Sequence, residues 1–243
     1  MKKVKGFVQF NEGIRDKMTP KPEDDVRRAL KKLPLRQRID KAKQFGTYSK
    51  EELDDLILQL DLNDRLMYGV TKGHIDAVKS AVENGADIHF DNDYPLRYAV
   101  ENKFPEIVRY LIANGADVKV ADDWSLKFIC EKGSAEIAQL LIDEGADVQV
   151  DDNSCLKIAS KNGHEEVVKL LLENGADVHS KDDLSLQWAV HNNHIGVVRV
   201  LLEFGADVYA QRNLAIKWAT KKGYTEIVDL LNEYAIKNLE KGY

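Results

Sequence analysis

The feature that most constrains the fold of this chain is an internal repeat of 30 residues. The tripeptide Gly-Ala-Asp recurs without insertion or deletion, beginning at Gly85, Gly115, Gly145, Gly175 and Gly205. An apolar series has the same spacing and comprises Leu66, Leu96, Leu126, Leu156, Leu186 and Ile216. Two series in phase predict an array of similar units, each burying its apolar face against its neighbours.

Each unit has the pattern of a helical hairpin. In residues 151–180, Leu156 and Ala159 share one face of a first helix, Gly163 ends that helix, and a second helix rich in Val and Leu follows. Glycine suits a helix end in the left-handed conformation, so Lys103, which replaces it in another unit, is expected to be strained.

Short polar residues stand at the start of the first helix in successive units. They are Asp93, Asp123, Asn153, Asp183 and Asn213. Because such side chains accept hydrogen bonds from exposed amides, we expect each of them to cap the first helix of its own unit.

Two groups of residues resemble the ankyrin repeat family. They are Tyr94-Pro95-Leu96-Arg97 with Ala99, and Gly163-His164 with Val168, Leu171, Leu172 and Gly175-Ala176-Asp177. The resemblance covers residues 61 to about 240 and implies an all-α solenoid of stacked helical hairpins with capping helices. The family period is about 33 residues, so the period of 30 implies shortened turns. Units of this length are similar to ankyrin arrays of large DNA viruses and phages.

The two ends of the array are expected to differ from the repeats. Residues 61–243 are interpreted as six repeats, the last acting as a C-terminal cap, and residues 33–60 as a degenerate N-terminal capping hairpin. In that hairpin, Leu35, Ile39, Ala42 and Phe45 form an apolar stripe that Gly46 ends, and Ser49 with Glu52 forms a capping box.

Residues 1–32 are interpreted as an N-terminal tail or targeting segment. A flexible extension, a segment packed on the first cap and a peptide that orders on a partner all remain open. Phe10-Asn11-Glu12-Gly13 weakly resembles the cleavage sites of phage prohead proteases, which would make the chain a virion-associated protein.

Charge and composition narrow the class of protein. The chain has 41 acidic and 35 basic residues, a formal charge of −6, which argues against a general affinity for nucleic acid. Cys130 and Cys155 are interpreted as free thiols. No apolar run has the length of a membrane span or a secretory signal, so we expect a monomeric protein of the cytoplasm, or of the host cytoplasm if it is viral.

No motif predicts catalysis, a cofactor or a metal. The chain has no phosphate-binding glycine loop, and His191 with His194 lacks a third ligand for zinc. His74, His164 and His194 follow the turn position and are interpreted as structural. The sequence therefore predicts no enzyme.

The predicted function is a scaffold or adaptor that binds a partner protein, for example a viral factor acting on a host protein. The resemblance implies binding on the concave side, at turns and at the ends of inner helices. The candidate residues are Asp93, Arg97, Glu101, Trp124, Lys127, Glu131, Lys132, Asn153, Lys157, Lys161, Asp183, His191, Lys217, Lys221 and Lys222.

Two other interpretations of these residues remain. The basic series Arg97, Lys127, Lys157 and Lys217 could bind nucleic acid, or could pair with the neighbouring acidic series. The aromatic series Tyr98, Phe128, Trp188 and Trp218 could stack on bases, although packing between repeats is favoured.

Overall fold

A computed structural model describes residues 26–27 and 29–240 of the chain. Fourteen helices, α2 to α15, have bounds within these residues, and the same part of the chain contains no strand. Most of the predicted N-terminal segment, including Phe10-Asn11-Glu12-Gly13, lies outside the described residues. The contacts divide the chain into two units, residues 1–60 and 61–243.

The first unit contains a helical hairpin formed by α2 (Leu35–Phe45) and α3 (Lys50–Leu58). Gly46 ends α2 in the left-handed conformation, and Ser49 forms the predicted capping box with Glu52 at the start of α3. Both local predictions are confirmed. The expected apolar stripe is only partly buried, because Phe45 is half exposed. The role of this hairpin as a cap stays a prediction.

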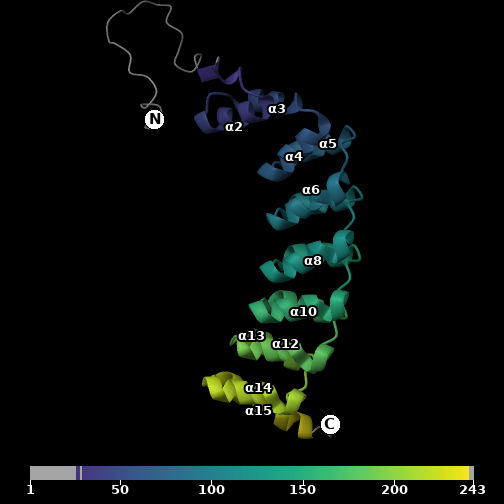
Figure 1. Ribbon diagram of the computed structural model, residues 1–243, viewed down its shortest axis with the longest axis vertical. Coiled ribbons are helices and arrows are strands. Elements are labelled where there is room, and N and C mark those ends of the chain that lie inside the picture. Colours follow the sequence, from purple (N-terminus) through teal and green to yellow (C-terminus); the bar gives the residue numbers. More distant parts are fainter. Residues whose placement is uncertain (1–25, 28, 241–243) are drawn as a thin grey trace, which may run out of the picture. The chain divides into compact units, whose positions relative to one another are not determined.

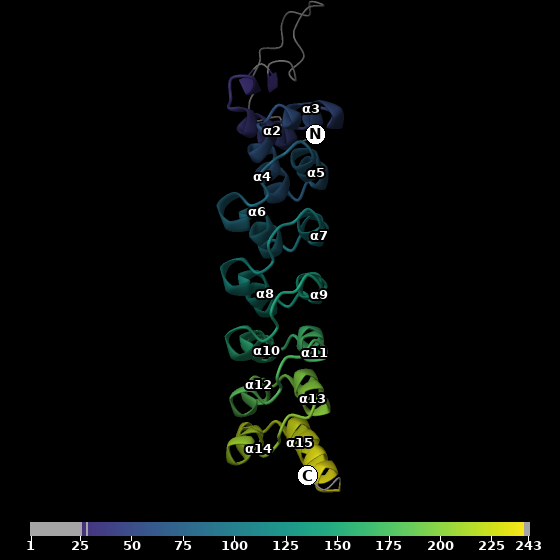
Figure 2. The ribbon, with the colours of Figure 1, turned by 90° about the vertical axis from the view of Figure 1, so that its right-hand side faces the viewer.

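The second unit is a stack of helical hairpins, each with an inner and an outer helix (Figure 1). The inner helices are α4 (Leu62–Lys72), α6 (Phe90–Glu101), α8 (Val120–Lys132), α10 (Val150–Asn162), α12 (Ser180–His191) and α14 (Ala210–Lys222). The outer helices are α5 (Ile75–Glu83), α7 (Pro105–Ala113), α9 (Ala135–Asp143), α11 (Glu165–Glu173), α13 (Ile195–Glu203) and α15 (Thr225–Glu240). Within this unit, Figure 2 shows the inner and outer helices as two columns.

The core of the second unit continues from one hairpin to the next. Leu96, Leu126 and Leu156 are completely buried, and neighbouring inner helices pack directly on each other. Cys130 and Cys155 are buried in this core as free thiols, as predicted. A hydrogen bond with Cys155, together with burial, raises the pKa of the Cys130 thiol well above its ordinary value.

The turn that leads into an inner helix, which the short repeat period predicted to be shortened, is left-handed. Residues 91–93, 151–153, 181–183 and 211–213 each have three consecutive positive φ angles, between 48° and 64°. For residues other than glycine, such angles cost roughly 1–2 kcal/mol of conformational energy each, and aspartate and asparagine tolerate them best. Lys103 also has a positive φ of 56°, so its predicted strain is present, but it shares this feature with all of these turns.

Candidate binding surface

One side of each inner helix from α6 to α14 remains accessible. Residues spaced by three, four and seven along a helix share one side of it. We define the inner-helix face by four such positions on each helix: Tyr94, Arg97, Tyr98 and Glu101; Trp124, Lys127, Phe128 and Glu131; Ser154, Lys157, Ile158 and Lys161; Leu184, Gln187, Trp188 and His191; and Leu214, Lys217, Trp218 and Lys221. All are exposed or half-buried except Gln187, which is buried.

Three of the predicted binding residues, Asp93, Asn153 and Asp183, are buried. Their side-chain oxygens accept hydrogen bonds from backbone N–H groups of the Gly-Ala-Asp tripeptide that closes the same repeat, at Asp117, Asp177 and Asp207, over 2.8 to 3.0 Å. The expectation that they cap the first helix is therefore wrong. These side chains tie the start of each repeat to its end and are not available to a partner.

The same bond recurs at a constant separation of 24 residues. Asp123 accepts the N–H of Asp147, and Asn63 accepts that of Asp87. The aspartate of each Gly-Ala-Asp tripeptide then accepts the N–H two residues later, as Asp147 does from Gln149. This role of the tripeptide was not predicted, although its separation of 24 residues from the short polar residues is constant in the sequence.

Most of the basic series is engaged within the protein. The Arg97 guanidinium donates to the carbonyls of Asp91 and Asn92, which belong to its own left-handed turn. Lys127 pairs with the Asp151 carboxylate at 2.9 Å, and this hydrogen bond and charge lower the pKa of Asp151. Only the Lys127 contact agrees with the predicted pairing with acidic residues, because Arg97 is held by backbone carbonyls instead.

Lys157 and Lys217 differ in their surroundings. Lys157 lies 3.5 Å from the carbonyl oxygen of Asp151, and burial lowers its pKa. Lys217 is exposed, and no carboxylate among the described residues pairs with it. The fourth cation of the series is therefore the one that remains accessible.

The aromatic residues lie partly exposed along the inner-helix face. Trp124 is half-buried because it stacks on Phe128, with ring centroids 4.9 Å apart. Further along the array, His191 lies between Trp188 and Trp218, at centroid distances of 5.9 and 5.1 Å. Tyr98, Phe128 and Trp218 also pack against the core. The predicted packing role is therefore present, and it leaves part of each ring accessible.

The residues at the ends of the inner helices divide into paired and unpaired groups. Glu131 forms an ion pair with Lys132 at 2.8 Å, and this contact lowers the pKa of Glu131. Lys222 donates to the carbonyl of His191 over 2.7 Å, and so links two repeats. Glu101, Lys161 and Lys221 are exposed. These residues change from acidic to basic along the array, from Glu101 to Lys221. Lys132 and Lys222 are already bound by Glu131 and by the His191 carbonyl.

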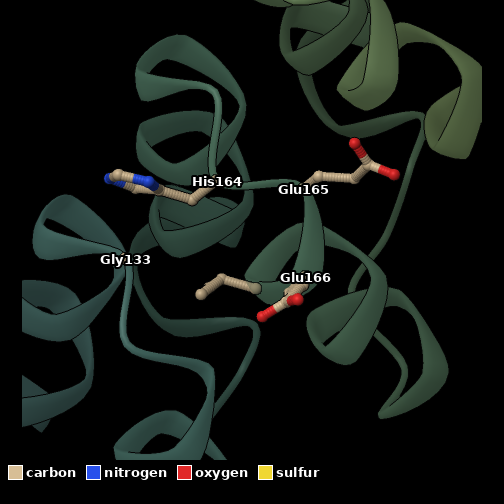
Figure 3. Close-up of a pocket in the computed structure, with 5 residues that line it drawn as sticks. Gly133, His164, Glu165 and Glu166 are labelled. Atoms are coloured by element: carbon tan, nitrogen blue, oxygen red, sulfur yellow. The ribbon is translucent and has the colours of Figure 1, made fainter.

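The turn histidines have local structural contacts, as the sequence analysis had interpreted them. A His164 ring nitrogen lies 2.8 Å from the Glu131 carbonyl, and the ring covers Gly133, where an added Cβ would collide with it. Figure 3 shows this ring over Gly133. The two residues line a hollow of about 330 Å³. The carboxylates of Glu165 and Glu166 point in different directions there. They form no converging pair for acid–base chemistry.

The described part of the chain contains neither a cluster of metal ligands nor a membrane-spanning helix. Within residues 26–27 and 29–240, no group of three or more His, Cys, Asp or Glu side chains could hold a metal ion. None of the helices in this part of the chain is both long and apolar enough to cross a membrane.

Comparisons with protein families support the repeat assignment directly. A family model described as ankyrin repeats (3 copies) matches residues 48–122 and 125–182. A second model, described as ankyrin repeats (many copies), matches residues 186–231. No curated protein sequence matches the chain. The matched segments cover α4, α6, α10 and α14 completely and most of α8 and α12.

Proposed function

Because the chain belongs to the ankyrin repeat family, we propose that its inner-helix face binds a partner protein. Ankyrin repeats are generally modules of protein–protein interaction, and proteins built from them are typically not enzymes. Function in such a fold depends on surface residues more than on the fold itself.

The observation that carries this proposal is the set of partly accessible aromatic rings on the inner helices α8, α12 and α14. Trp124, Phe128, Trp188 and Trp218 keep accessible surface although the opposite side of each helix is buried. Large, well-packed aromatic side chains are the residues that most often dominate binding energy at protein interfaces. Their positions are fixed by contacts such as Trp124 on Phe128, so little side-chain entropy is lost on binding.

The candidate residues are revised accordingly. We propose that Trp124, Lys161, His191, Lys217 and Lys221 contact the partner, with Glu101 and Glu131 at the acidic end of the face. Asp93, Asn153 and Asp183 are withdrawn because they are buried and bind the Gly-Ala-Asp backbone of their own repeat. The viral source, the cytoplasmic location and the monomeric state stay predictions.

The basic series gives little support to the nucleic-acid alternative. Arg97 and Lys127 are already engaged by backbone carbonyls or a carboxylate of this chain. Affinity for nucleic acid depends on the number of phosphates that free cations neutralise. The virion alternative depends on residues outside the described part of the chain.

Site-specific photo-crosslinking tests the proposed face. A photoreactive phenylalanine analogue is placed at Phe128 or Trp188 on the inner-helix face and, as matched controls, at Lys169 or Arg199 on the outer helices. Each variant is irradiated in an extract of the cells that express the protein. We expect one set of crosslinked proteins from positions 128 and 188 and none of these from the outer positions. Equal crosslinking from the outer helices would contradict the proposal.

A further inference from the structure

The last inner helix, α14, has an unbalanced charge. Residues 210–222 contain Arg212, Lys217, Lys221 and Lys222 and no acidic residue. Within the part of the chain that the structure describes, no carboxylate pairs with Arg212, Lys217 or Lys221, and all three are exposed. Lys222 donates to a carbonyl, which does not neutralise its charge. Four cations on one helix therefore have no paired carboxylate among the described residues.

The preceding inner helices do not share this imbalance. On α8 and α10, Lys127 pairs with Asp151, and Asp152 lies 3.5 Å from Lys181 of α12. On α6, Arg97 donates to carbonyls of its own turn. At the corresponding position of α12 the residue is Gln187, which is neutral and donates to the carbonyl of Asp182. Among the inner helices, the excess of positive charge is therefore specific to α14.

Aromatic side chains connect these cations into one strip. The Lys161 ammonium lies 5.1 Å from the Trp188 ring centroid, Trp188 contacts His191, and His191 contacts Trp218 of α14. The His191 Nδ1 atom is buried and has no hydrogen-bond partner among the described residues. We define the C-terminal basic strip as Lys161, Trp188, His191, Lys217, Trp218 and Lys221.

We propose that the C-terminal basic strip binds an acidic segment of the partner protein. This proposal rests on the proposed function and specifies the chemistry of the partner at that face. Carboxylates of the segment lie near Lys161, Lys217 and Lys221, and its apolar side chains pack on Trp188 and Trp218. Charge complementarity of this kind orients the segment and accelerates association.

An acidic peptide suits the strip better than nucleic acid does. The free cations are few and are separated by indole rings, which match a segment of alternating acidic and apolar residues. A polynucleotide carries a phosphate charge at every nucleotide, and the few free cations of the strip would neutralise only a small number of them. Single-stranded nucleic acid can also stack on tryptophan, so it is included in the test.

The test measures binding of defined probes to the full-length protein by fluorescence anisotropy. The probes are a labelled peptide of alternating glutamate and leucine, the same peptide with glutamine in place of glutamate, and labelled oligothymidylate. The test variant is Lys217→Glu with Lys221→Glu. Its matched control is Lys169→Glu with Arg199→Glu, which changes the net charge equally on outer helices.

We expect the glutamate peptide to bind more tightly than the glutamine peptide, with an affinity that falls as salt is added. The Lys217→Glu, Lys221→Glu variant should weaken binding roughly tenfold or more, and the outer-helix control should leave it nearly unchanged. Trp188→Phe provides a milder variant that keeps the fold and should weaken binding of both peptides.

Three outcomes would overturn the inference. They are no binding of the glutamate peptide, equal binding by the charge-reversed variant and its control, and tighter binding of oligothymidylate than of the glutamate peptide. None of these removes the proposed function, because crosslinking from Phe128 and Trp188 does not depend on the charge of the partner. Failure of that crosslinking would instead remove the proposed face itself.

Discussion

Interior repeats and the last repeat use the same residue positions differently. At one position, Asp123 and Asn153 are buried and accept an N–H group of the Gly-Ala-Asp tripeptide of their own repeat, whereas Asn213 is exposed. At another, Lys127 pairs with a carboxylate of the next repeat, whereas Lys217 has no such partner among the described residues. In the last repeat the Gly-Ala-Asp tripeptide is missing, and the outer helix α15 continues to Glu240.

The difference teaches that the function of a residue in this array depends on which segment of the chain packs beside it. Polar side chains in the interior are occupied by that segment and contribute to stability. The same side chains at the end of the array keep their charge and hydrogen-bonding capacity for another molecule. Stability and binding are therefore encoded by one repeated pattern.

The largest expected effect on stability comes from truncating an apolar side chain that packs between repeats. Leu126 is completely buried, so Leu126→Ala should lower the free energy of unfolding by about 2–5 kcal/mol. Ile216 occupies the same position in the last repeat and is only partly buried, so Ile216→Ala should cost less. Urea unfolding followed by circular dichroism measures both changes. Equal losses for the two variants would show that the last repeat packs as tightly as the interior.

An intermediate effect is expected for the hydrogen bond that ties the start of a repeat to its Gly-Ala-Asp tripeptide. Asn153→Ala leaves the Asp177 N–H without its acceptor and should cost about 1–3 kcal/mol. Asn213→Ala is the matched control: it removes an exposed side chain and should change stability by less than about 0.5 kcal/mol. The same urea titration measures both variants. If Asn213→Ala proved as costly as Asn153→Ala, the comparison between interior and end would be wrong.

The sequence predicts the fold well and the surface only in part, for a physical reason. A repeated period and an apolar series are sufficient to define stacked hairpins, because burial depends on residue type and spacing. The role of Asn153 was predicted wrongly because a short acceptor suits a helix N-terminus and a bond to the Gly-Ala-Asp backbone equally well. The Gly-Ala-Asp amide 24 residues later decides between the two roles, because Asn213 has the same left-handed backbone but no such amide beside it.

Accessibility on the inner-helix face was equally difficult to predict. Trp124 was expected to be an exposed anchor, but its stacking on Phe128 leaves it half-buried. The basic series looked uniform in the sequence, yet Lys127 and Lys217 differ because only Lys127 is followed by a repeat that carries a partner carboxylate. Such differences depend on neighbours in three dimensions, which a single position in a repeat does not reveal.

The smallest expected effect on stability concerns the charge of Asp183, which occupies the same position in its repeat as Asn153. Asp183 is buried, and this burial raises the pKa of its carboxyl, although the hydrogen bond from Asp207 acts in the opposite direction. A raised folded pKa means that the contribution of Asp183 to stability is complete below the pKa of the unfolded chain. That contribution is lost as the pH rises through the folded value. At neutral pH the buried charge therefore opposes folding.

Asp183→Asn should consequently stabilise the protein at neutral pH, by less than about 1 kcal/mol. Asparagine keeps the acceptor for the Asp207 N–H, as Asn153 does for Asp177. The gain in melting temperature should shrink below pH about 4, where the carboxyl is protonated in both states. Asn213→Asp, at the exposed end of the series, should leave the melting temperature nearly unchanged. A loss of stability in Asp183→Asn at neutral pH would mean that the ion pair with His179, at 3.3 Å, outweighs the cost of burying the carboxylate.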